Sequence, residues 1–339
     1  KLSGDGGELL WSSHVGVAHL VRDFDIDAAG NAYVVLAHQP GSVTNPLPSW
    51  FATAFNGAYQ SVRKDSEESG LAKISADGTQ VVWASWLGGN GLDSSIGSVR
   101  VDDQNRPYLA FYTDSADLPA TSGTTYSGGT DVFVARFSSD GSNLEMGAYF
   151  GGSGEDAFET HALGLGDGHV YLAGFTKSTD LPVDANALQA SYGGGSLDAF
   201  VAKLDLEGNL VAATYLGGSG AESTDGLSVT STGEVLFSGE TNSDDLPLAS
   251  NAFQAMRGGE GGHVIDARLA DAACGRVDDA LDGDLVGGVH QGLEVSNRVL
   301  DFLAIVERGA PRHLVGNAGP HQPVFDHPRQ RIDAVKHGH

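Results

Sequence analysis

The chain has 339 residues, 40% of them hydrophobic, with 48 glycines, one cysteine and a formal net charge of −25. The hydrophobic fraction suffices for a sizeable core and excludes disorder along the whole chain, whereas the single cysteine excludes a disulfide framework and a cysteine-based zinc cluster. No apolar run is long enough for a membrane-spanning helix, and the excess of 44 acidic over 19 basic residues opposes nucleic-acid binding.

Three short motifs recur along the chain about every 65 residues. Aromatic-Leu/Phe-Gly-Gly occurs at 86–89, 149–152 and 215–218, Asp-Leu-Pro at 117–119, 180–182 and 245–247, and Phe-Val-Ala-Arg/Lys at 133–136 and 200–203. Three motifs in one register identify a repeat. The repeat divides residues 1–269 into units at about 1–15 (partial), 16–87, 88–150, 151–216 and 217–269 (partial), followed by a tail at 270–339 without repeats.

The chain begins inside a repeat unit. Residues 1–6 align with 203–208, and residues 9–14 align with 211–216. The first 15 residues therefore correspond to the last two strands of a unit, and because Lys1 is not an initiator Met we expect a fragment or a processed product. Pairing of this segment with the partial unit at 217–269 would close a ring of four blades. Without that pairing the blades form an open arc, and the sequence leaves both arrangements open.

The unit at 16–87 is the most divergent copy, with additional residues at 49–55 and a charged run at Arg63–Glu68. We expect this insertion to face a partner, with Trp50 and Phe51 exposed.

The unit at 88–150 shows the strand pattern most clearly. Apolar residues alternate with polar ones in four segments, which predicts strands at 98–101, 107–112, 132–137 and 144–150. Asp140-Gly141 lies between the last two, as Asp77-Gly78 and Glu207-Gly208 do in the neighbouring units, where a hairpin needs residues that tolerate positive φ. Four short antiparallel strands per repeat predict an all-β protein, a β-propeller of four-stranded blades.

The motif order resembles the SBBP-type β-propeller repeat. The segments that carry the resemblance are 192–204, 215–220, 241–247 and 250–254. The resemblance covers roughly residues 1–269 and implies a bacterial protein that is secreted or attached to the cell surface. It implies no set of catalytic residues.

The tail at 270–339 departs from the repeat in composition. Residues 263–339 hold 8 of the 19 Lys and Arg residues and 7 of the 12 His residues. One interpretation is a separate, partly helical element with a helix at 296–307 behind a Ser296 cap. The other is an irregular stretch translated from a shifted reading frame. Both interpretations predict poor order beyond about residue 310.

The acidic residues Asp117, Asp180 and Asp245 recur at one position of the repeat and are the candidate metal ligands. Their structural alternative is a hydrogen bond from the side chain to a backbone N–H in a turn. Calcium is the ion considered, although the Asp23–Asp27 segment lacks the Gly and Glu of a complete calcium loop. The Gly-Gly-Ser-Gly segments lack the Lys and helix of a phosphate site, so we interpret them as points of close chain approach.

Other polar residues are interpreted as structural or solvent-facing. The carboxylates Glu155 with Asp156, and Glu222 with Asp225, recur in successive units, which favours scaffold roles over glycoside chemistry. His161 and His169 occur in one unit only, and His169 follows a predicted Asp-Gly turn. No helix start or paired His that would activate the thiol of Cys274 as a nucleophile is evident from the sequence.

These observations favour a non-enzymatic scaffold or binding module outside the cell or on its surface. The partners considered are a carbohydrate or another surface protein, with no cofactor and with calcium as the alternative; the oligomeric state is left open. The competing hypothesis is a hydrolase or lyase that acts on polysaccharides at the mouth of the propeller. An enzyme should carry unique, converging His, Asp, Glu, Tyr or Arg side chains, whereas scaffold residues repeat from blade to blade.

Overall fold

A computed structural model describes residues 1–13, 20–38, 49–65, 67–158, 161–250, 252, 254, 256 and 262–267. The chain divides into two units, Lys1–Asp284 and Leu285–His339, and all described residues belong to the first. The expectations for the tail at 270–339, including the helix at 296–307 and Cys274, lie outside the described residues.

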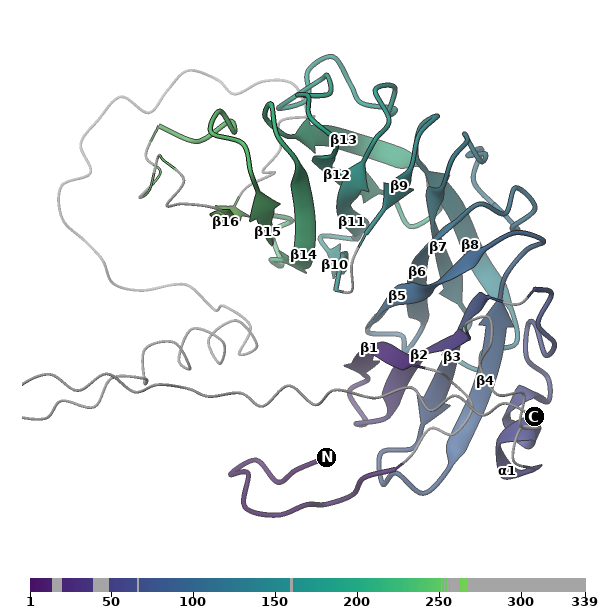
Figure 1. Ribbon diagram of the computed structural model, residues 1–339. Coiled ribbons are helices and arrows are strands. Elements are labelled where there is room, and N and C mark those ends of the chain that lie inside the picture. The colour runs from purple at the N-terminus through teal and green to yellow at the C-terminus, as the bar shows by residue number, and fades with distance from the viewer. Residues whose placement is uncertain are drawn as a thin grey trace, which may run out of the picture. The chain divides into compact units, whose positions relative to one another are not determined.

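Four antiparallel sheets follow one another along the chain (Figure 1). The first contains β1 (Leu20–Ile26), β2 (Ala32–His38), β3 (Glu68–Ile74) and β4 (Val81–Leu87). The second contains β5 (Asp93–Val101), β6 (Pro107–Thr113), β7 (Asp131–Phe137) and β8 (Leu144–Phe150). The third contains β10 (Leu163–Gly166), β11 (His169–Thr176), β12 (Asp198–Leu204) and β13 (Leu210–Leu216), with the short β9 (Asp156–Ala157) also paired to β11. The fourth contains β14 (Glu222–Val229), β15 (Val235–Thr241) and β16 (Gly262–Ala267).

Strands that are neighbours in sequence are neighbours in each sheet, so the order within a sheet is first, second, third and fourth. The predicted fold class is confirmed: the protein is all-β and built from the antiparallel blades of a β-propeller. The first two blades have four strands, the third has four with β9 added, and the described part of the fourth has three. The first strands of successive sheets contact one another, β1 with β5, β5 with β10, and β10 with β14.

The turns form where the sequence predicts them. Gly78, Gly141 and Gly208 lie between the third and fourth strands of their blades, with φ of 71°, 71° and 87°. This left-handed conformation is accessible to glycine without steric cost. Asp167 and Gly168 form the two-residue connection from β10 to β11, also with positive φ at both residues, as a hairpin of this length requires.

The middle strands are buried on both faces because each sheet packs between its neighbours. Strands β3, β6, β7 and β12 share one pattern, with a single partly exposed residue at the sixth position. One core cluster joins the first and second sheets and includes Tyr33, Leu109 and Phe133. Another joins the second and third sheets and includes Val134 and Phe200. Burial of these side chains is the main source of stability for sheets that cannot cover their own faces.

The N-terminal segment packs against the first sheet. The indole of Trp11 donates a hydrogen bond to the carbonyl of Ala76 at 3.1 Å, and its ring covers Gly78. Trp83 of β4 repeats this contact one blade later, donating to the Ser139 carbonyl and covering Gly141. Trp11 therefore occupies the position of a fourth-strand residue in a preceding blade.

Ring closure would require hydrogen bonds from residues 2–13 to residues 234–240 or 263–269. Within the described part of the chain, the backbone hydrogen bonds of residues 1–13 run inside that segment, which forms a small hairpin with a bridge between Leu2 and Leu9. The described pairings of β16 are with β15.

Candidate functional site

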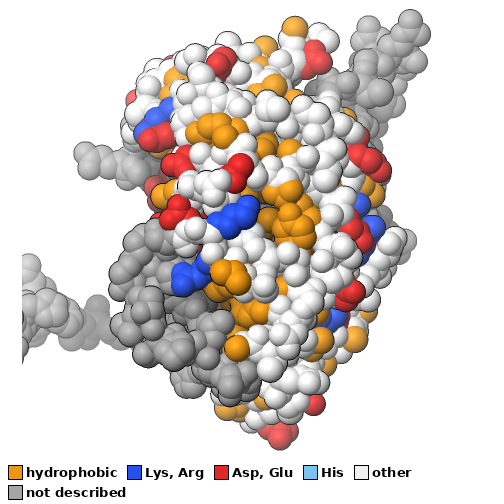
Figure 2. All heavy atoms as spheres, turned by 90° about the vertical axis from the view of Figure 1, so that its right-hand side faces the viewer, with side chains coloured by type: hydrophobic (Ala, Val, Ile, Leu, Met, Phe, Trp, Pro, Cys, Tyr) orange, Lys and Arg blue, Asp and Glu red, His pale blue; other side chains and the backbone are white. Residues whose placement is uncertain are grey.

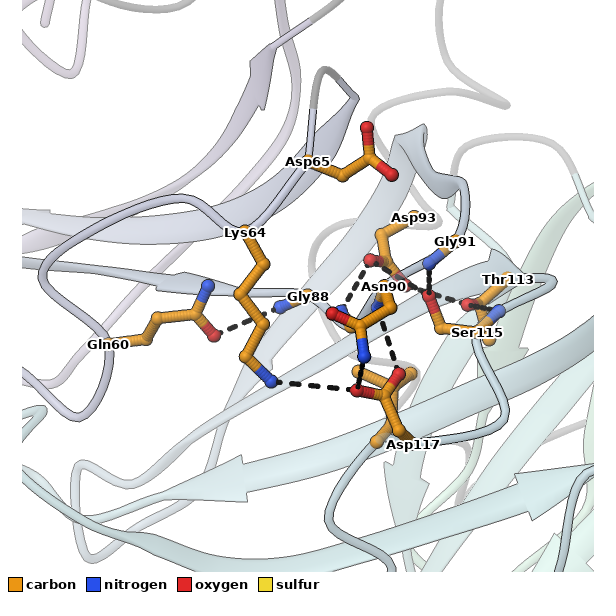
Figure 3. A network of polar contacts seen from close by, with 12 residues as sticks. Gln60, Lys64, Asp65, Gly88, Asn90, Gly91, Asp93, Thr113, Ser115 and Asp117 are labelled. Carbon is orange, nitrogen blue, oxygen red and sulfur yellow. Dashed lines mark hydrogen bonds and ion pairs between the residues drawn. The ribbon is translucent and has the colours of Figure 1, made fainter.

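A network of polar contacts surrounds the Gly-Gly segment that leads into the second blade (Figure 3). The carboxylate of Asp93 accepts hydrogen bonds from the Gly89 amide at 2.6 Å, the Thr113 hydroxyl at 2.7 Å and the Ser115 hydroxyl at 3.2 Å. The Asp117 carboxylate accepts the Asn90 amide at 2.8 Å. The network ties the loop before β5 to the loop after β6.

The same network recurs in the next two blades. Asp156 accepts bonds from the Gly152 amide and from the Thr176 and Ser178 hydroxyls. Glu222 accepts bonds from the Gly218 amide and from the Thr241 and Ser243 hydroxyls. Three copies of one arrangement, built from the repeating sequence, point to a structural role for these side chains.

The candidate metal ligands Asp117, Asp180 and Asp245 belong to this network, one in each of the second, third and fourth blades. Asp180 accepts the backbone N–H of Ser153 at 2.9 Å, and Asp245 accepts that of Ser219 at 2.8 Å. These backbone hydrogen bonds lower the pKa of Asp180 and of Asp245 below the ordinary aspartate value. Each donor lies 26 or 27 residues upstream of its acceptor. The bonds therefore join the loop before a blade's sheet to the loop after its second strand, and they do not stabilise a local turn. Among the described residues, no group of three or more His, Cys, Asp or Glu side chains could hold a metal ion.

The paired glycines allow these carboxylates to approach the backbone. A Cβ atom at Gly152 would lie 2.6 Å from Asp180 Oδ1, and one at Gly218 would lie 2.5 Å from Asp245 Oδ1. Both distances are shorter than any real contact of a Cβ atom. The amides of these glycines already donate to Asp156 and Glu222, and they bind the protein's own carboxylates instead of a phosphate.

A second set of carboxylates lies behind the glycines, and sequence reasoning missed it. Glu68, Asp131 and Asp198 are the first residues of β3, β7 and β12, and all three are fully buried. Each has one carboxylate oxygen without a hydrogen-bond partner. Burial raises the pKa of Glu68 to about 6, that of Asp131 to about 7 and that of Asp198 to about 6. The sequence signal that could have identified these carboxylates is an acidic residue at the start of each repeated apolar strand.

The alternating aspartates at 23–27 serve the contact between the first two blades. Asp23 Oδ2 accepts the Val99 amide at 3.1 Å, and Asp25 Oδ2 accepts the Val101 amide at 2.9 Å. These amides project from β5 away from its own sheet, and a buried N–H without a partner would be costly. The carboxylates on β1 satisfy them.

One cluster of titratable side chains does not repeat between blades. His161 Nδ1 lies 3.0 Å from Asp23 Oδ1, and Arg100 Nη1 lies 2.8 Å from Asp23 Oδ2. The three side chains come from β1, β5 and the segment before β10. The His161 side chain is 55% exposed, whereas that of Asp23 is buried. His161 also has a φ of 70°, a conformation uncommon for a residue with a side chain. We refer to Asp23, Arg100 and His161 as the inner-strand cluster.

The other polar residues named from the sequence remain apart. His169 is the first residue of β11, where its Nδ1 is 2.6 Å from the Asp167 carbonyl oxygen. Glu155 is exposed and pairs with Lys177, while its neighbour Asp156 is buried. The Glu222 and Asp225 pair is divided in the same way, the first residue buried and the second exposed. Neither acidic pair faces a shared reaction site.

The insertion in the first blade differs from the expectation of an exposed loop. A short helix, α1 (Ser49–Ala52), and a 3-10 turn, η1 (Thr53–Phe55), place Phe51 and Phe55 in the core of the first sheet. The expectation that Phe51 is exposed was wrong, because the spacing of these two aromatics places both on one helical face. Lys64, in the charged run that follows, lies 4.0 Å from Asp117 Oδ2 of the next blade, and both side chains are exposed.

Comparison with known proteins gives a weak structural likeness only. No family model and no curated protein matches the sequence. Two solved structures of a polysaccharide lyase of family PL25, an ulvan lyase, align with the chain, one of them bound to -[GlcA(1-4)Rha3S]-. Each has a TM-score of 0.36 and 9% sequence identity over 73% of this chain. The alignment covers 55% of the length of either lyase chain. None of the helices in the described residues is long and apolar enough to cross a membrane.

Proposed function

We propose that this protein is a non-enzymatic extracellular binding module of the SBBP-repeat type, with a neutral carbohydrate as its ligand. The observation that carries the proposal is the use of the repeating carboxylates. In the second, third and fourth blades they accept hydrogen bonds from the protein's own amides and hydroxyls, which leaves them no free role as acid and base. Side chains that repeat from blade to blade and bond the protein's own backbone have a structural role.

The inner-strand cluster is the proposed contact with the ligand. His161 is its exposed member, and the buried Asp23 holds the His161 ring in place. Polar side chains fixed in this way can bond sugar hydroxyls without first losing conformational entropy.

Electrostatics favour a neutral ligand over an acidic one. Residues 1–262 contain 33 acidic and 11 basic side chains. On the face shown in Figure 2, basic side chains are few and apolar ones gather near the middle. A strongly negative surface repels polyanions such as uronate-rich polysaccharides.

The second candidate function is a hydrolase or lyase acting on polysaccharides. The observation that favours it is the same His161–Asp23 pair. A histidine that acts as a general base is commonly oriented by a carboxylate in this way. The two functions differ in turnover, which allows one experiment to separate them.

The experiment measures binding and turnover on the same samples of the full chain. Soluble neutral glucans, xylans and galactomannans, together with a uronate polysaccharide, are titrated by calorimetry, and new reducing ends or unsaturated products are followed over hours. The variants are His161→Asn, which tolerates positive φ, and His169→Ala as the matched control. We expect binding of a neutral glycan that weakens at least tenfold in His161→Asn, persists in His169→Ala and leaves the glycan intact. Cleavage that is lost in His161→Asn would establish the enzyme instead, and binding unchanged in that variant would refute the site.

A further inference from the structure

Three buried carboxyl pairs lie at equivalent places, one where each blade meets the next. The pairs are Glu68 with Asp93, Asp131 with Asp156, and Asp198 with Glu222. In each pair one member begins the third strand of a blade, and the other lies at or next to the start of the following blade's sheet. All six side chains are at most 3% exposed.

The two members of a pair are close to each other. A Cβ atom at Gly88 would lie 2.6 Å from Glu68 Oε1 and 2.8 Å from Asp93 Oδ2, so these two oxygens are at most 5.4 Å apart. A Cβ atom at Gly151 would collide with both Asp131 Oδ1 and Asp156 Oδ2. The glycine at each of these two junctions therefore lies between two buried acidic groups. At the third junction a Cβ atom at Gly217 would collide with the carboxyl carbon of Asp198, and the charge of Glu222 acts on Asp198.

Hydrogen bonding is complete for one member of each pair and incomplete for the other. Asp93, Asp156 and Glu222 are held by an amide and two hydroxyls each, as described above. Asp131 Oδ2 accepts the Ser127 amide at 2.8 Å, and Asp198 Oδ2 accepts the Gly193 amide at 2.5 Å. The second oxygens, Asp131 Oδ1 and Asp198 Oδ1, have no partner, and the same is true of Glu68 Oε2.

The groups that face these pairs do not neutralise them. None of the ion pairs in the described part of the chain includes any of the six residues. The other charges acting at the junctions are acidic, Asp117 on Asp93 and Asp180 on Asp156. At the first junction the exposed Lys64 donates its backbone amide to Glu68, while its Nζ is directed to Asp117. The titratable groups that also face the pairs are tyrosines: Tyr126 and Tyr149 beside Asp131, and Tyr192 and Tyr215 beside Asp198.

We infer that each of these three junctions holds one proton, carried by the carboxyl whose second oxygen has no donor: Glu68, Asp131 and Asp198. Two buried charges of the same sign at this separation are costly, and a proton on one of them removes the repulsion. Burial and then the paired carboxylate raise the pKa of Asp131 and Asp198, in the direction that a shared proton requires. Burial also raises the pKa of Asp93 and of Asp156, so the hydrogen-bond geometry, and not the pKa shift, assigns the proton within each pair. A calcium ion would need six to eight oxygen ligands, more than a carboxyl pair supplies.

The consequence is a β-propeller that becomes less stable as the pH rises towards neutrality. For an acid whose pKa is raised by folding, the stabilisation is complete below the unfolded pKa, near 4, and is lost as the pH rises through the folded pKa, here about 6 to 7. Each proton contributes up to about a tenfold rise in the unfolding equilibrium constant per pH unit.

The test compares urea unfolding of the full chain between pH 4.5 and 7.5 in wild type, Asp131→Asn and Asp140→Asn. Asp140 is the matched control: it lies in the same blade, is exposed, and has a pKa lowered to about 2 by bonds from Ser138 and Ser142, so it does not titrate in this range. We expect the unfolding equilibrium constant of the wild type to rise with pH, and that of Asp140→Asn to rise equally. The unfolding constant of Asp131→Asn should rise less steeply, by up to a factor of about ten per pH unit.

Proton uptake gives a second measurement that does not depend on the variants. Native and urea-unfolded wild type are titrated potentiometrically at pH 5.5, and we expect the native chain to hold two to three more protons, on the order of one for each junction. Equal proton counts, or an identical pH dependence in wild type and Asp131→Asn, would overturn the inference. A stability that falls with chelator and returns with calcium would place a cation at the pairs and would overturn it equally.

Discussion

Replacing Gly152 by Ala tests whether the paired glycines are required by the approach of the carboxylates. The new methyl group would lie 2.6 Å from Asp180 Oδ1 and 2.7 Å from the Ser178 Cβ, both held in the network. Relief requires movement of the loop or loss of the Ser153–Asp180 bond. Overpacking of this kind costs about 1–3 kcal/mol, and a lost hydrogen bond to a charged group about 1.5–3 kcal/mol. Because either route relieves the overlap, we expect Gly152→Ala to reduce the free energy of unfolding by about 1–3 kcal/mol.

The assay is urea unfolding at fixed pH, followed by tryptophan fluorescence and by circular dichroism. Gly123→Ala is the matched control, since a Cβ atom there would meet nothing within 4 Å and its φ is not positive. That variant should be neutral or stabilised by about 0.4–1 kcal/mol. A Gly152→Ala protein within 0.5 kcal/mol of wild type, roughly the spread of neutral surface substitutions, would refute the argument from close approach.

Three further outcomes follow from the same structure. Asp180→Ala removes the acceptor of the Ser153 amide and hydroxyl and should cost about 1–3 kcal/mol in urea unfolding, whereas the exposed Asp184→Ala should cost less than about 0.5 kcal/mol. Phe133→Ala removes a ring that packs on Phe111 and Tyr149 and should cost about 3–5 kcal/mol; a smaller loss would mean that the blades pack loosely there. Millimolar chelator should leave the melting temperature of the full chain nearly unchanged, because no group of three or more His, Cys, Asp or Glu side chains among the described residues could hold a metal ion; a large drop reversed by calcium would contradict this.

The strands and turns could be predicted because their signals are local. Alternating apolar residues and Asp-Gly pairs such as Asp140-Gly141 specify a hairpin within about fifteen residues. The position of Phe51 was missed because α1 interrupts a strand pattern with a helical one, and only the core of the first sheet shows where its ring lies.

The polar networks were harder to predict because they join distant parts of the chain. Asp180 recurs visibly in the sequence, but its donor at Ser153 is 27 residues upstream. Asp131 resembles a turn residue before a strand, although its side chain is buried beside Asp156 at the junction with the next blade. The pairing of His161 with Asp23 joins the first blade to the segment before β10 of the third, and the sequence near either residue does not indicate the other.

The most direct test of the proposed division between scaffold and binding residues measures affinity and stability together. Calorimetric titration with the neutral glycan that binds best, and urea unfolding, are performed on His161→Asn and on Asp180→Asn. The account predicts that His161→Asn loses at least tenfold in affinity while keeping its stability, and that Asp180→Asn loses stability while keeping its affinity. Loss of affinity in Asp180→Asn with normal binding by His161→Asn would contradict it, because the repeating carboxylates would then be the ligand site.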